Sequence, residues 1–203
     1  MLTLSLFSNY IYSSPDGISY FFEQTGFTLS GLQQPLNQFQ EILKRGTDFG
    51  IFQPAKSEFD YTVLSPGFQR FLLEKLKKDS TLYTIVETAF IRQYEEMAME
   101  FRSMLGAEEA ETRREAFELI NFEQTNLLRA LHLLLDKGRT NIMISSVLRH
   151  HLERVHENEQ WIHLITRIVE KISQEPAIET PVMIITNQDS LANVLMESGR
   201  LED

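Results

Sequence analysis

Four histidines and three glutamates in a short stretch are the first candidates for chemistry. They lie within 14 residues of one another: His150, His151, His156 and His163, with Glu153, Glu157 and Glu159. Neutral imidazoles and carboxylates together can bind Zn²⁺. The spacing opposes such a site, because neighbouring His150 and His151 point apart and a helix break is expected just after Val155. A solvated face at a helix connection is the favoured interpretation, and no metal is predicted. The candidate ligands for a metal at this place are His151, His156, Glu159 and His163.

Two other groups of residues also make poor candidates for a catalytic site. Clustered carboxylates stand at Glu95, Glu96, Glu100, Glu108, Glu109 and Glu111. None is flanked by apolar residues in the way that an acid with a raised pKa requires. Ser145 and Ser146 lie near His150, but no strained turn would expose a nucleophile. We expect no catalytic residue, no cofactor and no enzymatic activity.

The charge of the chain is unevenly distributed. It has 203 residues, a formal net charge of −10, 42% apolar residues and no cysteine. Residues 1–79 carry −1 and residues 80–203 carry −9. An acidic surface repels phosphate backbones, so nucleic-acid binding by the second part is disfavoured. No apolar run reaches the ~20 residues needed to span a bilayer, so the expectation is a cytoplasmic protein without a membrane partner.

The first part of the sequence predicts three short helices, a β-hairpin and one further helix. Residues 2–12 are expected as a buried helix, with a strand as the alternative, and residues 18–25 and 32–45 as the next two helices, the last ending at Gly46. Residues 49–52 and 59–64 suit strands joined by a polar loop over 53–58. Ser65 and Pro66 then open a helix as N-cap and first helical residue. This order of elements is that of a winged-helix domain, which we assign to residues 1–79.

The second part predicts an antiparallel helical bundle over residues 80–175. The first helix, 80–105, has one apolar stripe: Leu82, Val86, Phe90, Tyr94, Met97, Phe101 and Met104. A second helix over 115–137 stops at Gly138, and Thr140 caps a third that carries Ile144, Val147, Leu148, Leu152 and Val155. A break over 156–158 precedes a fourth helix over 161–172. Prolines and a β-branched run predict a partly extended tail over 176–203.

Two motifs resemble a known family. The first approximates Y-x-[IL]-H-P-x-[LF]-x-x-[FY]-L, and the matching residues are Tyr61, Pro66, Phe68, Phe71 and Leu72. Ser65 stands where the family usually has histidine. The second resembles E-x-x-N-L-x-x-A-L, matched by Glu123, Asn126, Leu127, Ala130 and Leu131. Together they resemble the winged-helix and tetratricopeptide-linker region of STAND-type (NB-ARC-like) signalling ATPases.

The resemblance implies a mainly α protein: a winged-helix-like N-terminal domain with a small β-hairpin, then a tetratricopeptide-like antiparallel helical bundle. The chain has no G-x-x-x-x-G-K-[ST] loop to hold phosphates. Without that loop, the resemblance implies a non-enzymatic regulatory module. Its partner would be a protein, either a nucleotide-binding domain or a second copy of the chain. The helix over 80–105 would couple the two halves.

A winged-helix DNA-binding transcriptional regulator with a helical dimerisation domain is the alternative. The basic cluster behind it is Arg70, Lys75, Lys77 and Lys78. A helix C-terminus also favours such residues. The candidate recognition helix, Leu32–Arg45, has basic residues only at Lys44 and Arg45. Phenylalanines crowd the first part and are expected to form its core, with a minority left to contact a partner: Phe21, Phe22, Phe39, Phe49, Phe52, Phe59 and Phe68.

Overall fold

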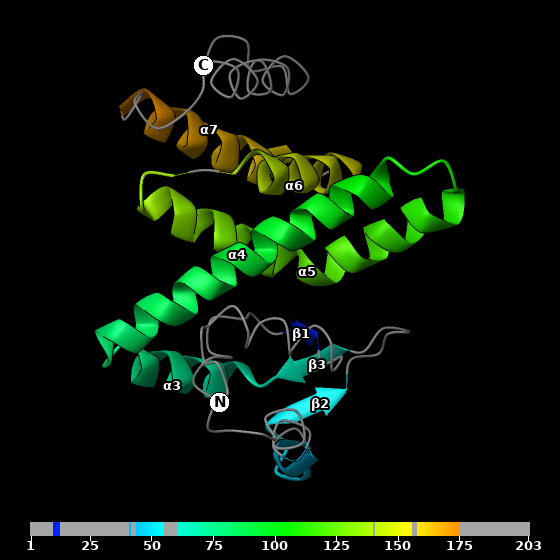
Figure 1. The fold of residues 1–203 in the computed structure, drawn as a ribbon. Helices are drawn as coiled ribbons and strands as arrows, with labels where there is room; N and C mark the ends of the chain where they lie inside the picture. Colours follow the sequence, from blue (N-terminus) through cyan, green and yellow to red (C-terminus); the bar gives the residue numbers. More distant parts are fainter. Residues whose placement is uncertain are drawn as a thin grey trace, which may run out of the picture. The chain divides into compact units, whose positions relative to one another are not determined.

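The computed structural model describes residues 10–12, 41, 44–54, 61–139, 141–155 and 158–174. Over these residues the chain is mainly helical with one small antiparallel sheet, as the sequence predicts (Figure 1). It divides into two compact units, residues 1–93 and 94–203. The boundary falls inside one long helix, so that helix contributes to both units, and each unit is described separately. No helix among the described residues is long and apolar enough to cross a membrane.

The sheet of the first unit is built around its last strand. β3 (Tyr61–Leu64) pairs on one edge with β2 (Phe52–Pro54) and on the other with β1 (Tyr10–Tyr12), both antiparallel. The predicted hairpin pairing is confirmed. The helix expected over 2–12 is wrong at residues 10–12, because the free edge of β3 offers a partner to a segment of tyrosines and isoleucine that suits a strand. Residues 2–9 lie outside the described part of the chain.

The first strand of the hairpin begins later than predicted. Residues 44–48 are still helical, and Gly50, not Gly46, takes the left-handed backbone conformation that ends the helix, with φ 69°. Phe49 therefore belongs to the turn, and β2 starts only at Phe52. Gly46 has a different role, because a Cβ there would overlap the ring of Phe52. Phe52 is fully buried and pairs in register with the equally buried Leu64.

α3 (Pro66–Leu76) starts where the sequence predicts. Ser65 occupies the N-cap position and Pro66 the first helical position, although the Ser65 side chain makes no capping hydrogen bond. Its carbonyl oxygen accepts hydrogen bonds from the backbone N–H groups of Phe68 and Gln69 instead. Leu72 and Leu76 are buried on one face. The helix thus presents an apolar side to the core and a charged side to solvent.

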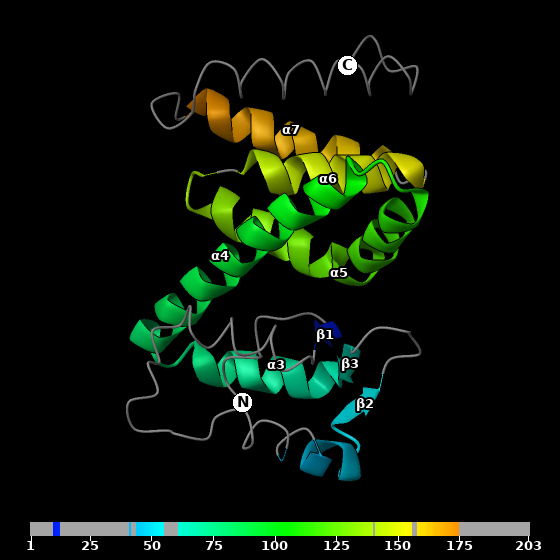
Figure 2. The same ribbon diagram turned by 45° about the vertical axis from the view of Figure 1, so that its right-hand side comes forward.

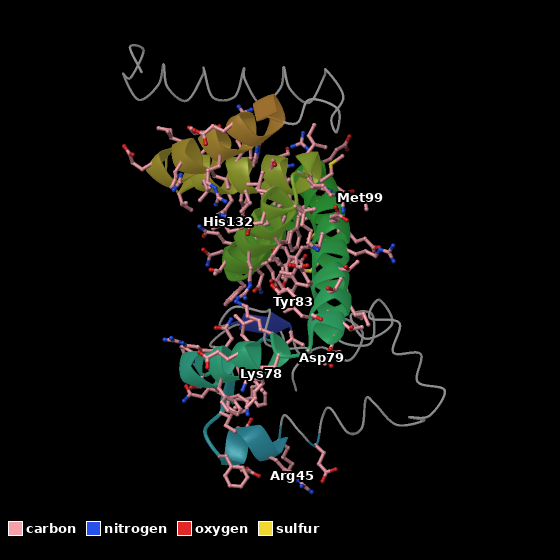
Figure 3. The ribbon with its side chains drawn as sticks, turned by 90° about the vertical axis from the view of Figure 1, so that its left-hand side faces the viewer. Arg45, Lys78, Asp79, Tyr83, Met99 and His132 are labelled. Atoms are coloured by element: carbon pink, nitrogen blue, oxygen red, sulfur yellow. The ribbon has the colours of Figure 1, made fainter. Side chains whose placement is uncertain are left out.

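α4 (Ser80–Leu105) follows α3 almost directly, with its predicted bounds confirmed. Asp79 Oδ1 accepts a 2.9 Å hydrogen bond from the backbone N–H of Leu82, which caps the helix. Figure 3 places Lys78 and Asp79 at this junction. Of the predicted stripe, the buried members are Val86, Phe90, Tyr94 and Phe101, while Leu82, Met97 and Met104 are half-buried.

Three further helices build the second unit: α5 (Ala110–Asp136), α6 (Ile142–Arg154) and α7 (Asn158–Gln174). α6 lies between α5 and α7 and packs on both, which Figures 1 and 2 show from two sides. Each helix buries a run of branched apolar residues. The fully buried ones include Ile120, Leu127, Leu131 and Leu134 of α5, Ile144, Val147, Leu148 and Leu152 of α6, and Ile165 and Ile168 of α7.

The ends of these helices depart from the prediction at several points. α7 runs over Asn158–Gln174, whereas the sequence predicts a helix over 161–172 after a break at 156–158. α5 starts at Ala110 and not at Glu115, because Arg113 donates hydrogen bonds to the carbonyls of Ala107 and Glu108 and so fixes the first turn. Asn141, not Thr140, caps α6. Val155 is 42% exposed, because it lies just past the last turn of α6. Gly138 ends α5 as predicted, with φ 67°.

Several sequence-based expectations lie outside the described residues. They are the helices over 18–25 and over most of 32–45, residues 55–58 of the predicted loop, residues 59–60 of the predicted strand and the tail over 176–203. The domain division after residue 79 stays a prediction.

Candidate functional site

A buried hydrogen-bond network of three polar side chains joins α4 to α5 in the second unit. Tyr94 donates a 2.7 Å hydrogen bond from its hydroxyl to Glu123 Oε2, and Asn126 Nδ2 donates another of 2.7 Å to the same oxygen. All three side chains are buried, with exposed fractions of 1% for Tyr94 and Glu123 and 0% for Asn126. Burying a carboxylate is costly unless it is hydrogen-bonded, and here both donors reach the same oxygen, Oε2. The network therefore holds two helices together in the interior of the unit.

The E-x-x-N spacing explains the α5 half of this network. Glu123 and Asn126 stand three positions apart on a helix, where side chains are neighbours. Leu127 follows on the same face and is fully buried. Both polar residues of the motif thus point inward with an apolar residue beside them. Their place inside the bundle assigns them a structural role.

Asn141 connects α6 to α4. Its Oδ1 accepts hydrogen bonds from the backbone N–H groups of Met143 and Ile144, at 2.9 and 3.0 Å. Its Nδ2 donates a 3.1 Å hydrogen bond to Glu95 Oε1. One amide side chain therefore caps a helix and ties its first turn to a neighbouring helix. Glu95, considered above as a catalytic carboxylate, serves here as an acceptor.

The candidate metal ligands that the structure describes have separate surroundings. His151 is 3% exposed, and its Nε2 donates a 3.1 Å hydrogen bond to Gln124 Oε1 of α5. Glu159 and His163 are exposed on α7, and His156 lies outside the described residues. Among the residues that the structure describes, no three His, Asp or Glu side chains gather in a way that could hold a metal ion. The expectation of no metal stays a prediction.

Ser145 is likewise occupied. Its hydroxyl donates a 2.9 Å hydrogen bond to the carbonyl of Asn141, one helical turn back. His150 instead lies 6.3 Å from the ring of Phe117, centroid to centroid and nearly parallel to it. The guanidinium of Arg154 covers the same ring at 3.6 Å. These contacts bind α6 to α5 and give no nucleophile–base pair.

One polar cluster lies at the surface between α5 and α7. Arg167 Nη1 lies 2.8 Å from His132 Nδ1, and Arg167 Nη2 lies 3.5 Å from Asp136 Oδ1. Burial lowers the pKa of His132 below 6.5, the charges of Arg167 and His163 lower it further, and Asp136 opposes them. Figure 3 shows His132 and Met99 at opposite edges of this unit.

The basic cluster of α3 lies on its solvent side. Arg70 Nε forms an ion pair with Glu74 at 3.3 Å, and Lys75 Nζ lies 5.4 Å from the ring centroid of Phe71. Phe71 is 49% exposed, although it belongs to the first family-like motif. Phe68 of the same motif is half-buried, with its ring centroid 6.0 Å from that of Phe71. Leu72 of the same motif is buried in the core of the unit.

The remaining motif residues shape the backbone. Tyr61 opens β3, where it pairs with Tyr12, and Pro66 opens α3. Sequence reasoning missed three side chains that organise the second unit: Tyr94 as a hydrogen-bond donor, Asn141 as a cap and Arg167 as the partner of His132. Only Asn141 had a local signal, since asparagine before an apolar helical run is a strong N-cap. The other two pair with residues 29 and 35 positions away.

Comparisons of the chain with protein-family models, with curated proteins and with solved structures find no match.

Proposed function

We propose that this chain is a non-enzymatic protein-interaction and regulatory module, similar to the part of a STAND-type signalling ATPase that links its nucleotide-binding domain to its sensor repeats. The observation that carries the proposal is the burial of Glu123 and Asn126 with Tyr94. In a functional site, such polar groups would open onto a pocket or cleft. Here they lock helices of an antiparallel array, which is the architecture of a binding scaffold.

The sheet of the first unit supports the winged-helix part of the proposal. A hairpin whose second strand also pairs with an N-terminal strand, in the order β1-β3-β2, is the sheet arrangement of winged-helix domains. A helix follows that sheet directly in α3. In the second unit, the helices α5, α6 and α7 pack in sequence order, as the helices of a tetratricopeptide-like array do.

Two phenylalanines supply the proposed contact with a nucleotide-binding domain. Phe49 is 80% exposed and Phe71 is 49% exposed, so both aromatic rings meet solvent in this unit. Exposed aromatic side chains are enriched at the centres of protein interfaces. Lys75 beside the Phe71 ring would add a cation to the contact.

The test is an affinity measurement with the full chain. A nucleotide-binding domain that carries the phosphate-binding loop, encoded in the same genome, is titrated by calorimetry. We expect binding that weakens at least about tenfold in the double variant Phe49→Ser, Phe71→Ser, because each lost aromatic anchor costs roughly 1 kcal/mol or more. Met99→Ser removes an apolar side chain that is 53% exposed in the other unit and serves as the matched control. Equal affinity of the double variant, or no binding by the wild type, would refute this contact.

DNA binding remains the second candidate because Arg70 and Lys75 are exposed on α3, and Lys77 and Lys78 are exposed just after its end. Two of them are already engaged, Arg70 with Glu74 and Lys75 with Phe71. Binding through phosphates falls steeply with salt, so a gel shift at low and high salt decides this alternative. A salt-sensitive shift that disappears in Lys77→Glu, Lys78→Glu would favour the DNA-binding regulator.

A further inference from the structure

The contact between α5 and α7 contains a hydrogen bond that only one protonation state of histidine allows. Arg167 Nη1 lies 2.8 Å from His132 Nδ1. A guanidinium has donors and no acceptor, so Nδ1 must accept. The imidazole of His132 is therefore neutral, with its proton on Nε2.

Two other titratable groups, Asp136 and His163, lie around this bond. Arg167 also reaches Asp136, one turn after His132 on α5, at 3.5 Å. His163 stands on α7 one turn before Arg167 and acts on His132 through its charge. The charge of His163 opposes protonation of His132, whereas the charge of Asp136 favours it.

We propose that the docking of α7 on α5 is acid-sensitive: protonation of His132 removes the acceptor for Arg167 and places two cations in contact, which loosens α7. The device converts a fall in pH into partial release of one helix of the array. Histidine is the side chain whose charge ordinarily changes between about pH 5 and pH 8.

The direction of the pKa shift agrees with this geometry. Burial and the neighbouring Arg167 lower the pKa of His132 below its ordinary value of 6.5. An opened α7 relieves that shift, so the open state binds a proton first as the pH falls. The docked state is accordingly favoured at neutral pH, and its advantage is lost as the pH drops through 6.5 towards the lowered value.

The test is hydrogen exchange of the full chain, followed by mass spectrometry at pH 7.5 and pH 5.5 and corrected for intrinsic exchange rates. Peptides from α6 serve as the internal reference. We expect the protection of α7 to fall at least about twofold relative to α6 on acidification, because the docked state loses its advantage as the pH drops. His132→Gln retains an acceptor that does not titrate, so its α7 protection should stay constant relative to α6.

Two further variants separate this device from general acid destabilisation. His150→Gln changes an exposed histidine that contacts Phe117 and should retain the wild-type pH dependence. Arg167→Met removes the donor and should make α7 exchange faster already at pH 7.5, with little further change in acid. The proposal is overturned if wild-type α7 protection does not respond to pH, or if His132→Gln responds as the wild type does.

Discussion

Tyr94 and Glu123 share a 2.7 Å hydrogen bond in the interior of the second unit, although 29 residues separate them in the sequence. The bond joins α4 to α5, and Asn126 donates to the same carboxylate oxygen. A stripe that looks purely apolar in the sequence thus contains one polar atom with a defined partner. The contact between α4 and α5 therefore includes a specific hydrogen bond to Glu123 as well as apolar packing.

Tyr94→Phe should destabilise the protein without changing the shape of the core. It removes only the hydroxyl, and a buried group that loses a hydrogen-bond partner costs about 1–3 kcal/mol. Chemical denaturation measures the change in the free energy of unfolding. In a cycle with Glu123→Gln, the two effects should be clearly non-additive, because the residues are in contact. Additive effects would show that the hydrogen bond contributes nothing to stability.

Asn141→Ala should lower the free energy of unfolding by about 1–2 kcal/mol, because it removes the side-chain acceptor for two backbone N–H groups at the start of α6. Asn141→Ser is the matched control, since serine is also a good N-cap. The serine variant loses only the hydrogen bond to Glu95, so its free energy of unfolding should fall less than that of the alanine variant. If serine and alanine destabilise equally, the contact with Glu95 matters and the cap does not.

Gly46→Ala should destabilise the first unit by about 1–3 kcal/mol, because the new Cβ would overlap the buried ring of Phe52. Gly67→Ala is the control in the same unit: it lies in α3, has open space around it and an ordinary helical backbone. Alanine there should stabilise by about 0.4–1 kcal/mol. Thermal unfolding compares the two, and a neutral Gly46→Ala would contradict the close packing against Phe52.

The ring protons of His132 should titrate at a pH below 6.5 in a nuclear magnetic resonance experiment. In Arg167→Met the midpoint should rise, because the charge and the donor that oppose protonation are gone. Asp136→Asn should move it the other way, since the aspartate favours the protonated ring. A wild-type midpoint above 6.5 would contradict the described contact.

Local signals predicted much of the backbone. Pro66 marks the start of α3, Asp79 precedes α4, and Gly138 ends α5 with the positive φ that glycine tolerates. One error arises where a distant partner decides: Tyr10–Tyr12 form a strand because they pair with β3. Another error is local, since β2 starts late because the chain turns at Gly50 and not at Gly46.

The polar contacts were harder to predict than the helices. Periodicity assigns Tyr94 to an apolar face, but it does not indicate that the hydroxyl meets Glu123 on another helix. Arg167 and His132 are paired by the packing of α7 against α5, which no local pattern encodes. The E-x-x-N motif did mark two of the three members of the buried network. The burial of Glu123 and Asn126 gives this motif a structural role.

Sedimentation velocity of the full chain is the most direct test of the proposed function. The chain is measured alone over a range of concentrations, with the nucleotide-binding domain described above, and with duplex DNA at two salt concentrations. The proposed interaction module should form a heavier species with that domain or with its own copy, and none with DNA at physiological salt. A chain that stays monomeric in both protein samples, and sediments faster only with DNA at low salt, would contradict it.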